Sequence, residues 1–296
     1  MTKKNYLALF AKSFNWAGFF LPKNIYHDCS KLYAFCRVLD DLVDEKISLE
    51  IRTVRFNKIK EIFEISYNQT NTDEILIHQD EHKSIVSEMI NIADNKNIKR
   101  IILDDLIEGV GSDLKSKVYL RSVKDLLVYS YKVAGTVGLM MAKILNVNDT
   151  RSLRGAIDLG IAMQLTNIAR DVIEDQKMNR QYIKPNFENI EATLKLADMF
   201  YESSFSSIKS IPFKYRFAII VARRVYRQIG RKILNKRNMV NYEKAGKIYI
   251  NNLGKILQTV LSTFDLIILF LKDIEPHQRK IEHEIISEDV NLDERI

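Results

Sequence analysis

Apolar side chains recur along most of the chain with the 3.6-residue period of an α-helix, and polar side chains fill the positions between them. The polar, Asn-rich stretch 67–80 is expected to be a surface loop, and the charged tail 275–296 is expected to fray. The pattern therefore favours an all-α protein. The helices that it predicts lie at about 5–20, 48–66, 81–94, 98–114, 123–146, 149–177, 190–209, 213–235 and 245–272.

The segment 33–45, with the sequence YAFCRVLDDLVDE, combines two stripes on one further predicted helix. One stripe is apolar and would face a protein core. The other is polar and lies beside it. At about 100° per residue, offsets of 4, 7 and 11 keep its members within about 60° of one another. These polar residues are Tyr33, Arg37, Asp40 and Asp44.

A second helix repeats this arrangement. In the segment 160–181, GIAMQLTNIARDVIEDQKMNRQ, amide and carboxylate side chains follow one another at offsets of 3, 7 and 11, and Arg170 directly precedes the first carboxylate. Two acidic residues four positions apart repel each other in a helix. A single pair is most often a solvated face, but two such pairs on mostly apolar helices favour a binding function. The members of the second face are Gln164, Asn167, Asp171 and Asp175.

The two acidic faces have the chemistry of a magnesium site. Carboxylate oxygens with no His or Cys nearby suit hard cations. Magnesium commonly binds through one or two carboxylates together with phosphate oxygens and water. Two facing carboxylate pairs would hold a cluster of magnesium ions, and the cluster would hold a diphosphate. Arg37 and Arg170 could contact phosphate oxygens directly.

Composition agrees with one large helical domain. The chain has 296 residues, 46% of them hydrophobic, and its 10 Gly and 4 Pro are too few for a turn-rich β fold. We therefore treat residues 1–296 as a single domain around a large core or cavity. Cys29 and Cys36 are seven residues apart on a predicted helix, too far for a disulfide, and indicate reduced core residues of a cytosolic protein.

The net charge of +7 is compatible with several anionic partners, namely nucleic acid, a membrane surface or an anionic substrate. No nucleic-acid motif accompanies the scattered Lys and Arg. The N-terminus lacks a signal-peptide core, so export is not expected. The apolar run 256–271 is shorter than the ~20 residues that span a bilayer. It is either a buried core helix or a helix lying on a membrane surface.

Two small residues interrupt the apolar helix predicted at 123–146. Gly135 and Gly138 cost about 1 kcal/mol each in a helix interior, which indicates either close helix packing or a break that opens space for a ligand. Tyr129, one helical turn before Val133, is a core residue or a site residue. A bulky substitution at Ala134 or Gly138 is expected to shorten the substrate that the protein accepts, if these residues line a substrate tunnel.

Several of these stretches resemble the phytoene and squalene synthase family, and most closely its bacterial phytoene synthases. They are YAFCRVLDDLVDE, YSYKVAGTVGLMMAKIL, AMQLTNIARDVIED followed by NRQYI, and RRVYRQIGRKI. The similarity extends over about 13–255, and the combination of motifs is highly specific.

The resemblance implies a type I isoprenoid (terpenoid) synthase fold, with helices around a central apolar cavity. It also implies a Mg²⁺-dependent prenyltransferase, for which Mn²⁺ could substitute and no NADPH is expected. Two geranylgeranyl diphosphates would join head to head through prephytoene diphosphate to give phytoene and two diphosphates. This reaction is the first committed step of carotenoid biosynthesis.

The resemblance also assigns roles to matching positions. Metal binding is implied for Asp40, Asp41, Asp44, Asn167, Asp171 and Asp175. Catalytic roles are implied for these aspartates other than Asp41, and for Tyr129 and Arg37. Substrate binding is implied for Ser13, Phe14, Tyr33, Arg37, Gln164, Asn167, Arg170, Arg180 and Tyr182.

The chain departs from the family pattern in two places. Asn179 stands where the family usually has Gly, and Lys184 replaces a common Pro after the Tyr. The segment 235–248, NKRNMVNYEKAGKI, lacks the usual Arg-Val or Arg-Ser strip. These differences leave the contacts at the C-terminal end, and the choice of substrate length, open.

Other functions fit the sequence less well. A (dehydro)squalene synthase acting on farnesyl diphosphate differs only in the depth of the cavity. A non-catalytic helical assembly factor would be expected to lose the acidic motifs, and a nucleic-acid-binding protein would leave them unexplained. Because substrate and product are long hydrocarbons, we expect a cytoplasmic protein with peripheral contact to the inner face of the membrane. Contact with downstream carotenoid enzymes is a further expectation.

Overall fold

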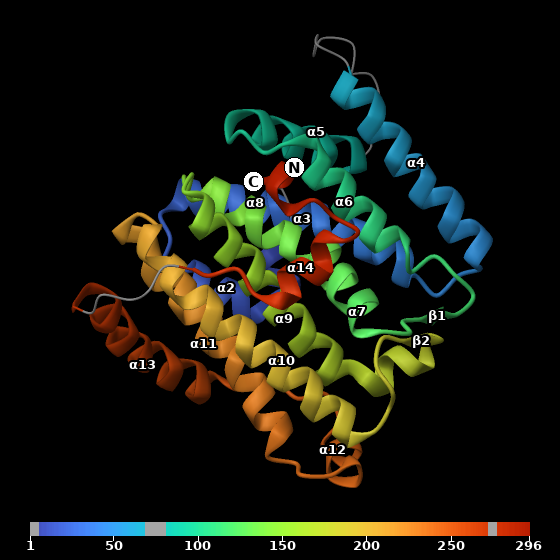
Figure 1. Cartoon of the computed structure of the whole chain (residues 1–296). Coiled ribbons are helices and arrows are strands. Elements are labelled where there is room, and N and C mark those ends of the chain that lie inside the picture. The colour runs from blue at the N-terminus through green and yellow to red at the C-terminus, as the bar shows by residue number, and fades with distance from the viewer. Residues whose placement is uncertain (1–5, 69–80, 272–276) are drawn as a thin grey trace.

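The computed structural model of the chain describes residues 6–68, 81–271 and 277–296. Helices make up nearly all of this part, which confirms the predicted all-α fold (Figure 1). Strands within it are limited to a two-residue parallel pair, in which Val118 is opposite Arg180. Most of the loop predicted at 67–80, namely 69–80, lies outside the described residues, as do 275–276 of the tail.

The first half of the chain forms the upper part of the molecule in Figure 1. Its elements are α1 (Tyr6–Phe10), α2 (Lys12–Gly18), α3 (Lys23–Asp44), α4 (Leu49–Asn68), α5 (Glu81–Asn95), α6 (Arg100–Gly111), β1 (Val118–Tyr119), α7 (Val123–Ser130), the π-helical turn η2 (Tyr131–Gly135) and α8 (Thr136–Ile144).

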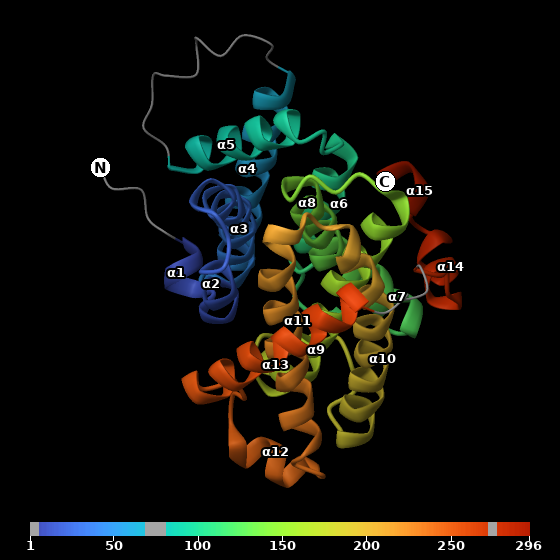
Figure 2. The same ribbon diagram turned by 90° about the vertical axis from the view of Figure 1, so that its left-hand side faces the viewer.

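The second half begins with α9, the longest described helix, and α10 and α11 pack against it (Figure 2). Its elements are α9 (Thr150–Lys177), β2 (Arg180–Gln181), α10 (Phe187–Phe205), the 3₁₀ turn η3 (Ser206–Ser210), α11 (Phe213–Leu234), α12 (Met239–Ala245), α13 (Asn252–Leu271), α14 (Ile281–Ser287) and α15 (Leu292–Arg295).

The helix α9 is the central element because half of its residues are buried, on most of its sides. Ile161, Leu165 and Ala169 are fully buried, and the helix packs against α8, α10 and α11. The side chain of Asp149 caps its N-terminus by accepting a hydrogen bond from the backbone N–H of Ser152. A long, rigid helix with one polar face is thereby held in the middle of the protein.

Two glycines allow α9 to approach η2 and α8 closely. A Cβ atom on Gly138 would lie 2.1 Å from the carbonyl oxygen of Ala156, and one on Gly160 would lie 2.1 Å from that of Ala134. The chain also makes a π-helical turn at η2, next to this contact. Both sequence interpretations of the glycine-containing helix, close packing and a local break, therefore apply.

Three local predictions were wrong. The helix predicted at 5–20 is broken at Ala11, whose φ and ψ of −117° and 61° are not helical. The short helix α12 precedes α13 where a single helix beginning at 245 was expected. The described part of the tail does not fray but forms α14 and α15.

The tail is held by Asp158, a fully buried carboxylate of α9. One of its oxygens accepts a hydrogen bond from Nε2 of His277 at 2.8 Å, and the other accepts one from Nε2 of His283 at 2.7 Å. Burial alone would raise the pKa of Asp158. The hydrogen bonds from the two histidines have the opposite effect and outweigh burial, so the pKa lies below its usual value. Arg295 adds an ion pair to Asp105 of α6 at 2.9 Å.

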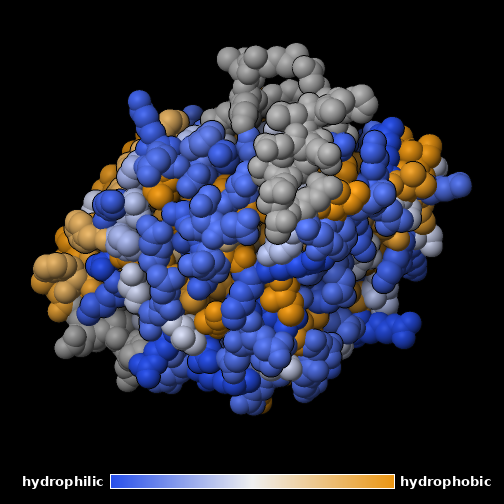
Figure 3. All heavy atoms as spheres, turned by 90° about the horizontal axis from the view of Figure 1, so that it is seen from above, coloured by the Kyte–Doolittle hydropathy of each residue, from blue (hydrophilic) through white to orange (hydrophobic). Residues whose placement is uncertain are grey.

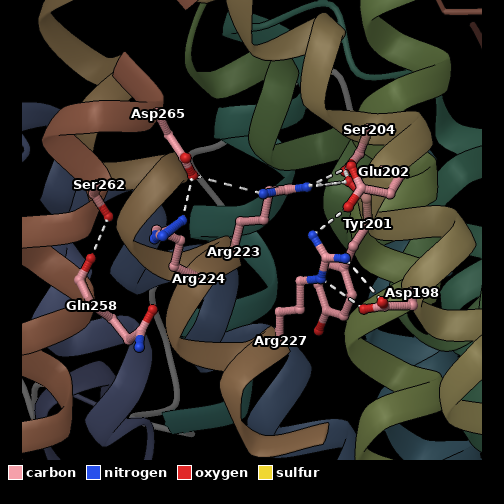
Figure 4. A network of polar contacts seen from close by, with 10 residues as sticks. All are labelled: Asp198, Tyr201, Glu202, Ser204, Arg223, Arg224, Arg227, Gln258, Ser262 and Asp265. Atoms are coloured by element: carbon pink, nitrogen blue, oxygen red, sulfur yellow. Dashed lines mark hydrogen bonds and ion pairs between the residues drawn. The ribbon is translucent and has the colours of Figure 1, made fainter. Parts of the chain in front are cut away.

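The helix α13 is polar on the inside and apolar on the outside, so the core-helix interpretation was wrong. Its buried residues include Lys255, Gln258 and Ser262. Asp265 accepts a hydrogen bond at 3.0 Å from Arg224 of α11, within the network of Figure 4. The exposed residues of α13 are Leu253, Ile256, Leu257, Val260, Phe264, Ile267, Ile268, Phe270 and Leu271.

Candidate active site

A cavity of about 560 Å³ lies between α3 and α9. It collects nearly every residue that the sequence singled out for a site. Two predicted site residues, Ser13 and Asp41, are not part of its lining. The predicted residues that line it are Phe14, Tyr33, Arg37, Asp40, Asp44, Tyr129, Gln164, Asn167, Arg170, Asp171, Asp175, Arg180 and Tyr182.

The helix α3 supplies the first acidic face. It begins after Pro22, whose fixed φ suits the residue before a helix, and it buries Leu32, Phe35 and Leu39 in the core. Burial, and then the charge of Asp44, raises the pKa of Asp40 to about 7. Asp40 lines the cavity, where its exposed carboxyl is accessible to a ligand.

Asp41 points away from this face. It forms an ion pair with Arg37, one helical turn earlier, and does not line the cavity. The chain therefore presents Asp40 and Asp44 to the cavity, while Asp41 holds the guanidinium of Arg37. The geometry separates three carboxylates that the sequence motif places side by side.

The helix α9 supplies the second acidic face. Arg170 makes two hydrogen bonds to Asp171, from Nε to Oδ1 at 2.8 Å and from Nη2 to Oδ2 at 2.5 Å. Lys247, from the segment after α12, approaches the same Oδ1 at 3.2 Å. Burial, and then the charge of Asp171, raises the pKa of Asp175 to about 7.

Arg180 joins the two faces. Its Nη1 donates to Oδ1 of Asp44 at 2.6 Å and its Nη2 donates to the carbonyl oxygen of Val43 at 3.1 Å. Asn179, just before it, has φ of 58°, a left-handed conformation that Gly adopts most easily and Asn tolerates best among other residues. This explains why Asn can stand at the position where the family pattern has Gly. The turn directs Arg180 from the end of α9 toward α3.

The rest of the cavity is mainly apolar. Phe14 of α2 lies against Tyr226 of α11, with ring centroids 4.8 Å apart. From there the lining continues along α8, α9 and η3 as far as Gly155 and Ile208. A polar end with carboxylates and arginines thus continues into an apolar end suited to a hydrocarbon.

Three cavity residues were missed by the sequence analysis. Asp113 accepts hydrogen bonds from Tyr129 and Tyr182, and it lies at the end of the helix predicted at 98–114. Lys247 lies in the segment that was thought to lack basic family contacts. Tyr226 belongs to the quoted motif RRVYRQIGRKI, so the resemblance could have found it.

The polar end fits a divalent metal ion. Four carboxylates with raised pKa values or ion-pair partners converge there, and Oδ1 of Asn167 is buried with no hydrogen-bond partner among the described residues. A hard cation would satisfy this oxygen and offset the repulsion between the carboxylates. The residues that could hold such ions are Asp40, Asp44, Asn167, Asp171 and Asp175.

The raised pKa values predict that the affinity of this end for a divalent metal ion increases with pH. Asp40 and Asp175 have pKa values of about 7 in the metal-free fold, above the ~3.9 of an unfolded Asp. Their contribution to the stability of the metal-free fold is therefore present at low pH and lost as pH rises through about 7. Metal requires the ionised form, so protons compete with it below that pH.

We expect the association constant for magnesium to rise about tenfold between pH 6 and pH 8, with release of protons. Calorimetric titrations in two buffers of different ionisation enthalpy measure both quantities. An affinity that stays constant over this range, with no proton release, would contradict the assignment.

Comparison with known proteins gives consistent matches. The family described as squalene/phytoene synthase matches residues 7–184. The 15-cis-phytoene synthase of Paracoccus sp. (strain N81106 / MBIC 01143) is 32% identical over 267 residues, which cover 82% of this chain and 86% of that protein. The 15-cis-phytoene synthase of Pantoea ananas is 30% identical over 249 residues, which cover 77% and 80%.

Solved structures share the fold. A dehydrosqualene synthase in complex with a ligand superposes with a TM-score of 0.67 at 24% identity, over 88% of this chain and 93% of that one. Squalene synthase HpnC from Alicyclobacillus acidocaldarius superposes with a TM-score of 0.63 at 17% identity, over 78% and 91%. At these identities the likeness concerns the arrangement of the helices.

Proposed function

Because the chain belongs to the squalene/phytoene synthase family, we propose that it is a 15-cis-phytoene synthase, a transferase that joins two geranylgeranyl diphosphates head to head. The observation that carries this proposal is the meeting of two acidic helix faces at one end of an apolar cavity. Relatives of that name match most of the chain and support the choice of substrate.

The acidic end would bind the diphosphate groups. Asp40 and Asp44 on one side, and Asp171 and Asp175 on the other, would hold magnesium ions. When bound, these ions neutralise the charge that develops on a departing diphosphate. The guanidinium of Arg180, already directed at Asp44, would move to contact phosphate oxygens once metal neutralises that carboxylate.

Lys247 and Arg170 would act in the same way on the side of α9. Both now pair with Asp171. Metal binding to Asp171 would weaken these ion pairs, so that Lys247 and Arg170 could contact phosphate oxygens of the diphosphate. Together with Arg180, which contacts Asp44 of α3, they would place basic groups at both acidic faces.

The apolar part of the cavity would hold the two prenyl chains and exclude water. The reaction passes through an allylic cation that the double bond of the second substrate captures, and water would otherwise quench it. The rings of Phe14 and Tyr226, packed against each other in the wall, offer faces that attract such a cation.

The test of this function is a product analysis. Purified protein is incubated with geranylgeranyl diphosphate and magnesium, without NADPH, and in parallel with farnesyl diphosphate. We expect a C40 hydrocarbon from the first substrate and little product from the second. A C30 product from farnesyl diphosphate alone would assign the protein to the dehydrosqualene group. No product from either substrate, with folded protein and detergent, would exclude a synthase.

We further propose that the protein is cytoplasmic and contacts the inner face of the membrane through α13. The helix has 20 residues and is the one helix in the described part that is long and apolar enough to cross a bilayer. Its polar residues, however, attach it sideways to α11. An apolar face turned outward on an attached helix suits the surface of a leaflet. Apolar atoms are visible in Figure 3 at its left edge, the side on which Figure 1 places α13.

A pair of substitutions tests this contact. Phe264 and Phe270 of α13 are 58% and 72% exposed, so replacing both by Ser should leave the fold intact. We expect binding to vesicles with anionic lipid, measured by co-sedimentation, to weaken about tenfold, equivalent to about 1.4 kcal/mol of lost apolar contact. The matched control replaces Ile51 and Val54, exposed on α4, by Ser. Equal effects of the two double variants, or no vesicle binding by the unmodified protein at low salt, would rule out α13 as the contact.

A further inference from the structure

A buried carboxylate outside the two acidic faces organises a third side of the cavity. Asp113, in the turn that follows α6, is 5% exposed and lines the cavity. Its Oδ2 accepts hydrogen bonds from the hydroxyls of Tyr129 and Tyr182, each at 2.8 Å. The end of α6, the helix α7 and the segment after β2 therefore meet at one oxygen atom.

The two tyrosines form a stacked pair. Their ring centroids are 4.8 Å apart with an interplanar angle of 24°, and their hydroxyl oxygens are 3.1 Å apart. Both side chains line the cavity, while both hydroxyls are occupied by Asp113. What the pair offers to the cavity is thus its aromatic rings rather than free hydroxyl groups.

The charge of Asp113 is not neutralised by a direct ion pair among the described residues. Its Oδ1 is buried and has no hydrogen-bond partner there. Another Tyr–Asp contact in the same region is different: Tyr131 donates to Asp105 at 3.0 Å, but Arg295 also binds both oxygens of Asp105, at 2.9 and 3.2 Å. Asp105 does not line the cavity. Of these two Tyr–Asp contacts, only that of Asp113 therefore places at the cavity a carboxylate without an ion-pair partner among the described residues.

The protonation states of Tyr129, Tyr182 and Asp113 agree with two phenols that donate hydrogen bonds to a carboxylate. Burial raises the pKa of Tyr129 and of Tyr182 well above the usual value, so both remain phenols that donate hydrogen bonds. Burial raises the pKa of Asp113 as well, while Arg180 and the two phenols oppose the shift. Two donors on one oxygen is an arrangement that suits a carboxylate.

We infer that Asp113 is a positioning residue for the stabilisation of the carbocation. It holds the rings of Tyr129 and Tyr182 against the cavity and draws their phenolic hydrogens toward itself, which makes both rings richer in electrons. An allylic cation beside them would be attracted by the ring faces and by the carboxylate behind them. This inference rests on the proposed function, because only an ionising substrate produces such a cation.

The test compares a cationic ligand with a neutral one, so it needs no turnover. The probes are a prenyl diphosphate analogue with an ammonium nitrogen at the allylic carbon and its uncharged carbon isostere. The measured quantity is the ratio of their dissociation constants, with magnesium present, in the unmodified protein and in Asp113→Asn. Asn keeps an acceptor oxygen for a phenol but carries no charge.

We expect the unmodified protein to prefer the ammonium analogue, and Asp113→Asn to lower this preference about tenfold, equivalent to about 1.4 kcal/mol. With the natural substrate, kcat should fall about 100-fold while KM stays within about threefold. The matched control is Asp105→Asn, which alters a buried Tyr–Asp contact away from the cavity and should leave the preference unchanged. If Asp113→Asn does not fold, Tyr182→Phe, which keeps both rings, should lower the preference about threefold, equivalent to about 0.65 kcal/mol.

The inference is overturned by an unchanged preference in Asp113→Asn or, if that variant is unfolded, in Tyr182→Phe. It is also overturned by an equal loss in Asp105→Asn, or by no preference in the unmodified protein. Failure of the proposed function would be seen in a different experiment, the product analysis, as the absence of product from both prenyl diphosphates. The binding ratio then still reports whether Asp113 favours a cation in the cavity.

Discussion

Asp40→Ala and Asp171→Ala are each expected to reduce the rate of phytoene formation by about 10³-fold or more, equivalent to about 4 kcal/mol of transition-state stabilisation. Asp40 lies on the face of α3 and Asp171 on that of α9, and both line the cavity. Departure of a diphosphate needs charge neutralisation from both sides, so the loss of either carboxylate should weaken metal binding and slow ionisation. The measurement is single-turnover formation of product at saturating magnesium.

Stability should not explain the loss at Asp40. Burial and the charge of Asp44 raise the pKa of Asp40 to about 7, so its ionised form destabilises the metal-free fold at higher pH. Asp40→Ala removes that cost, and we expect an unchanged or higher midpoint of thermal unfolding at pH 8. A variant that is inactive because it is unfolded would contradict this part of the account.

Asp41→Ala is the matched control. Asp41 belongs to the same sequence motif but pairs with Arg37 and does not line the cavity. We expect its replacement to cost about tenfold or less, through looser positioning of Arg37. A loss as large as that of Asp40→Ala would show that the third carboxylate also takes part in metal binding, as the family motif implies.

Gly160→Ala is expected to destabilise the fold by about 3 kcal/mol. The new Cβ atom would lie 2.1 Å from the carbonyl oxygen of Ala134 and 2.7 Å from its carbonyl carbon. These are backbone atoms, so they cannot rotate away, and α9 would have to move from η2, the turn that leads into α8. The free energy of unfolding in urea measures the effect. Because the shift also displaces the second acidic face, activity should fall with stability.

A glycine of α11 provides the comparison. A Cβ atom on Gly230 would meet only Cδ2 of Leu194, at 3.1 Å, and a leucine side chain can shift by a few tenths of an ångström. The higher helix propensity of Ala, about 1 kcal/mol, should offset this contact, so we expect Gly230→Ala to change stability by less than about 1 kcal/mol. Similar effects of the two substitutions on stability would mean that the close approach of η2 and α9 is not needed.

Close helix packing also changes what a bulky substitution at Gly138 can show. Such a substitution was expected to shorten the substrate that the protein accepts. Gly138 is part of the cavity lining, but a side chain there would run into the carbonyl oxygen of Ala156. A bulky residue at Gly138 would separate the helices before it shortened the cavity. Loss of activity in such a variant would therefore report on packing and not on substrate length.

The acidic faces could be predicted because they depend on local periodicity alone. Residues four apart share a side of any helix, whatever surrounds it. The prediction that the two faces form one site needed only the preference of carboxylate oxygens for hard cations. Asp113 and Lys247 could not be found in this way, because each reaches the cavity from a turn or a loop whose path depends on distant contacts. Asp113, for example, meets its partners Tyr129 and Tyr182 only in the folded chain.

The helix α13 shows a different limit. Its apolar run was first interpreted as a core helix because hydrophobicity does not say which side is outward. A polar stripe on the same helix could have indicated its orientation. It faces inward because α11 offers Arg224 as a hydrogen-bond donor to Asp265, and this contact is not evident from the sequence. The stripe consists of Lys255, Gln258, Ser262 and Asp265. The prediction that the tail would fray was wrong for a similar reason. Its charged residues indicated a segment exposed to solvent, but two of its His residues form hydrogen bonds with the buried Asp158.

The central claim is that the faces of α3 and α9 form one metal and diphosphate site. Its most direct test is a crystal structure with manganese and a non-ionisable geranylgeranyl diphosphate analogue, in which anomalous scattering locates the metal. The account predicts ions bound to Asp40 or Asp44 on one side and to Asn167, Asp171 or Asp175 on the other, with the diphosphate between them and the prenyl chain in the apolar part of the cavity. Ions bound at one face only, or a diphosphate bound away from both faces, would contradict it.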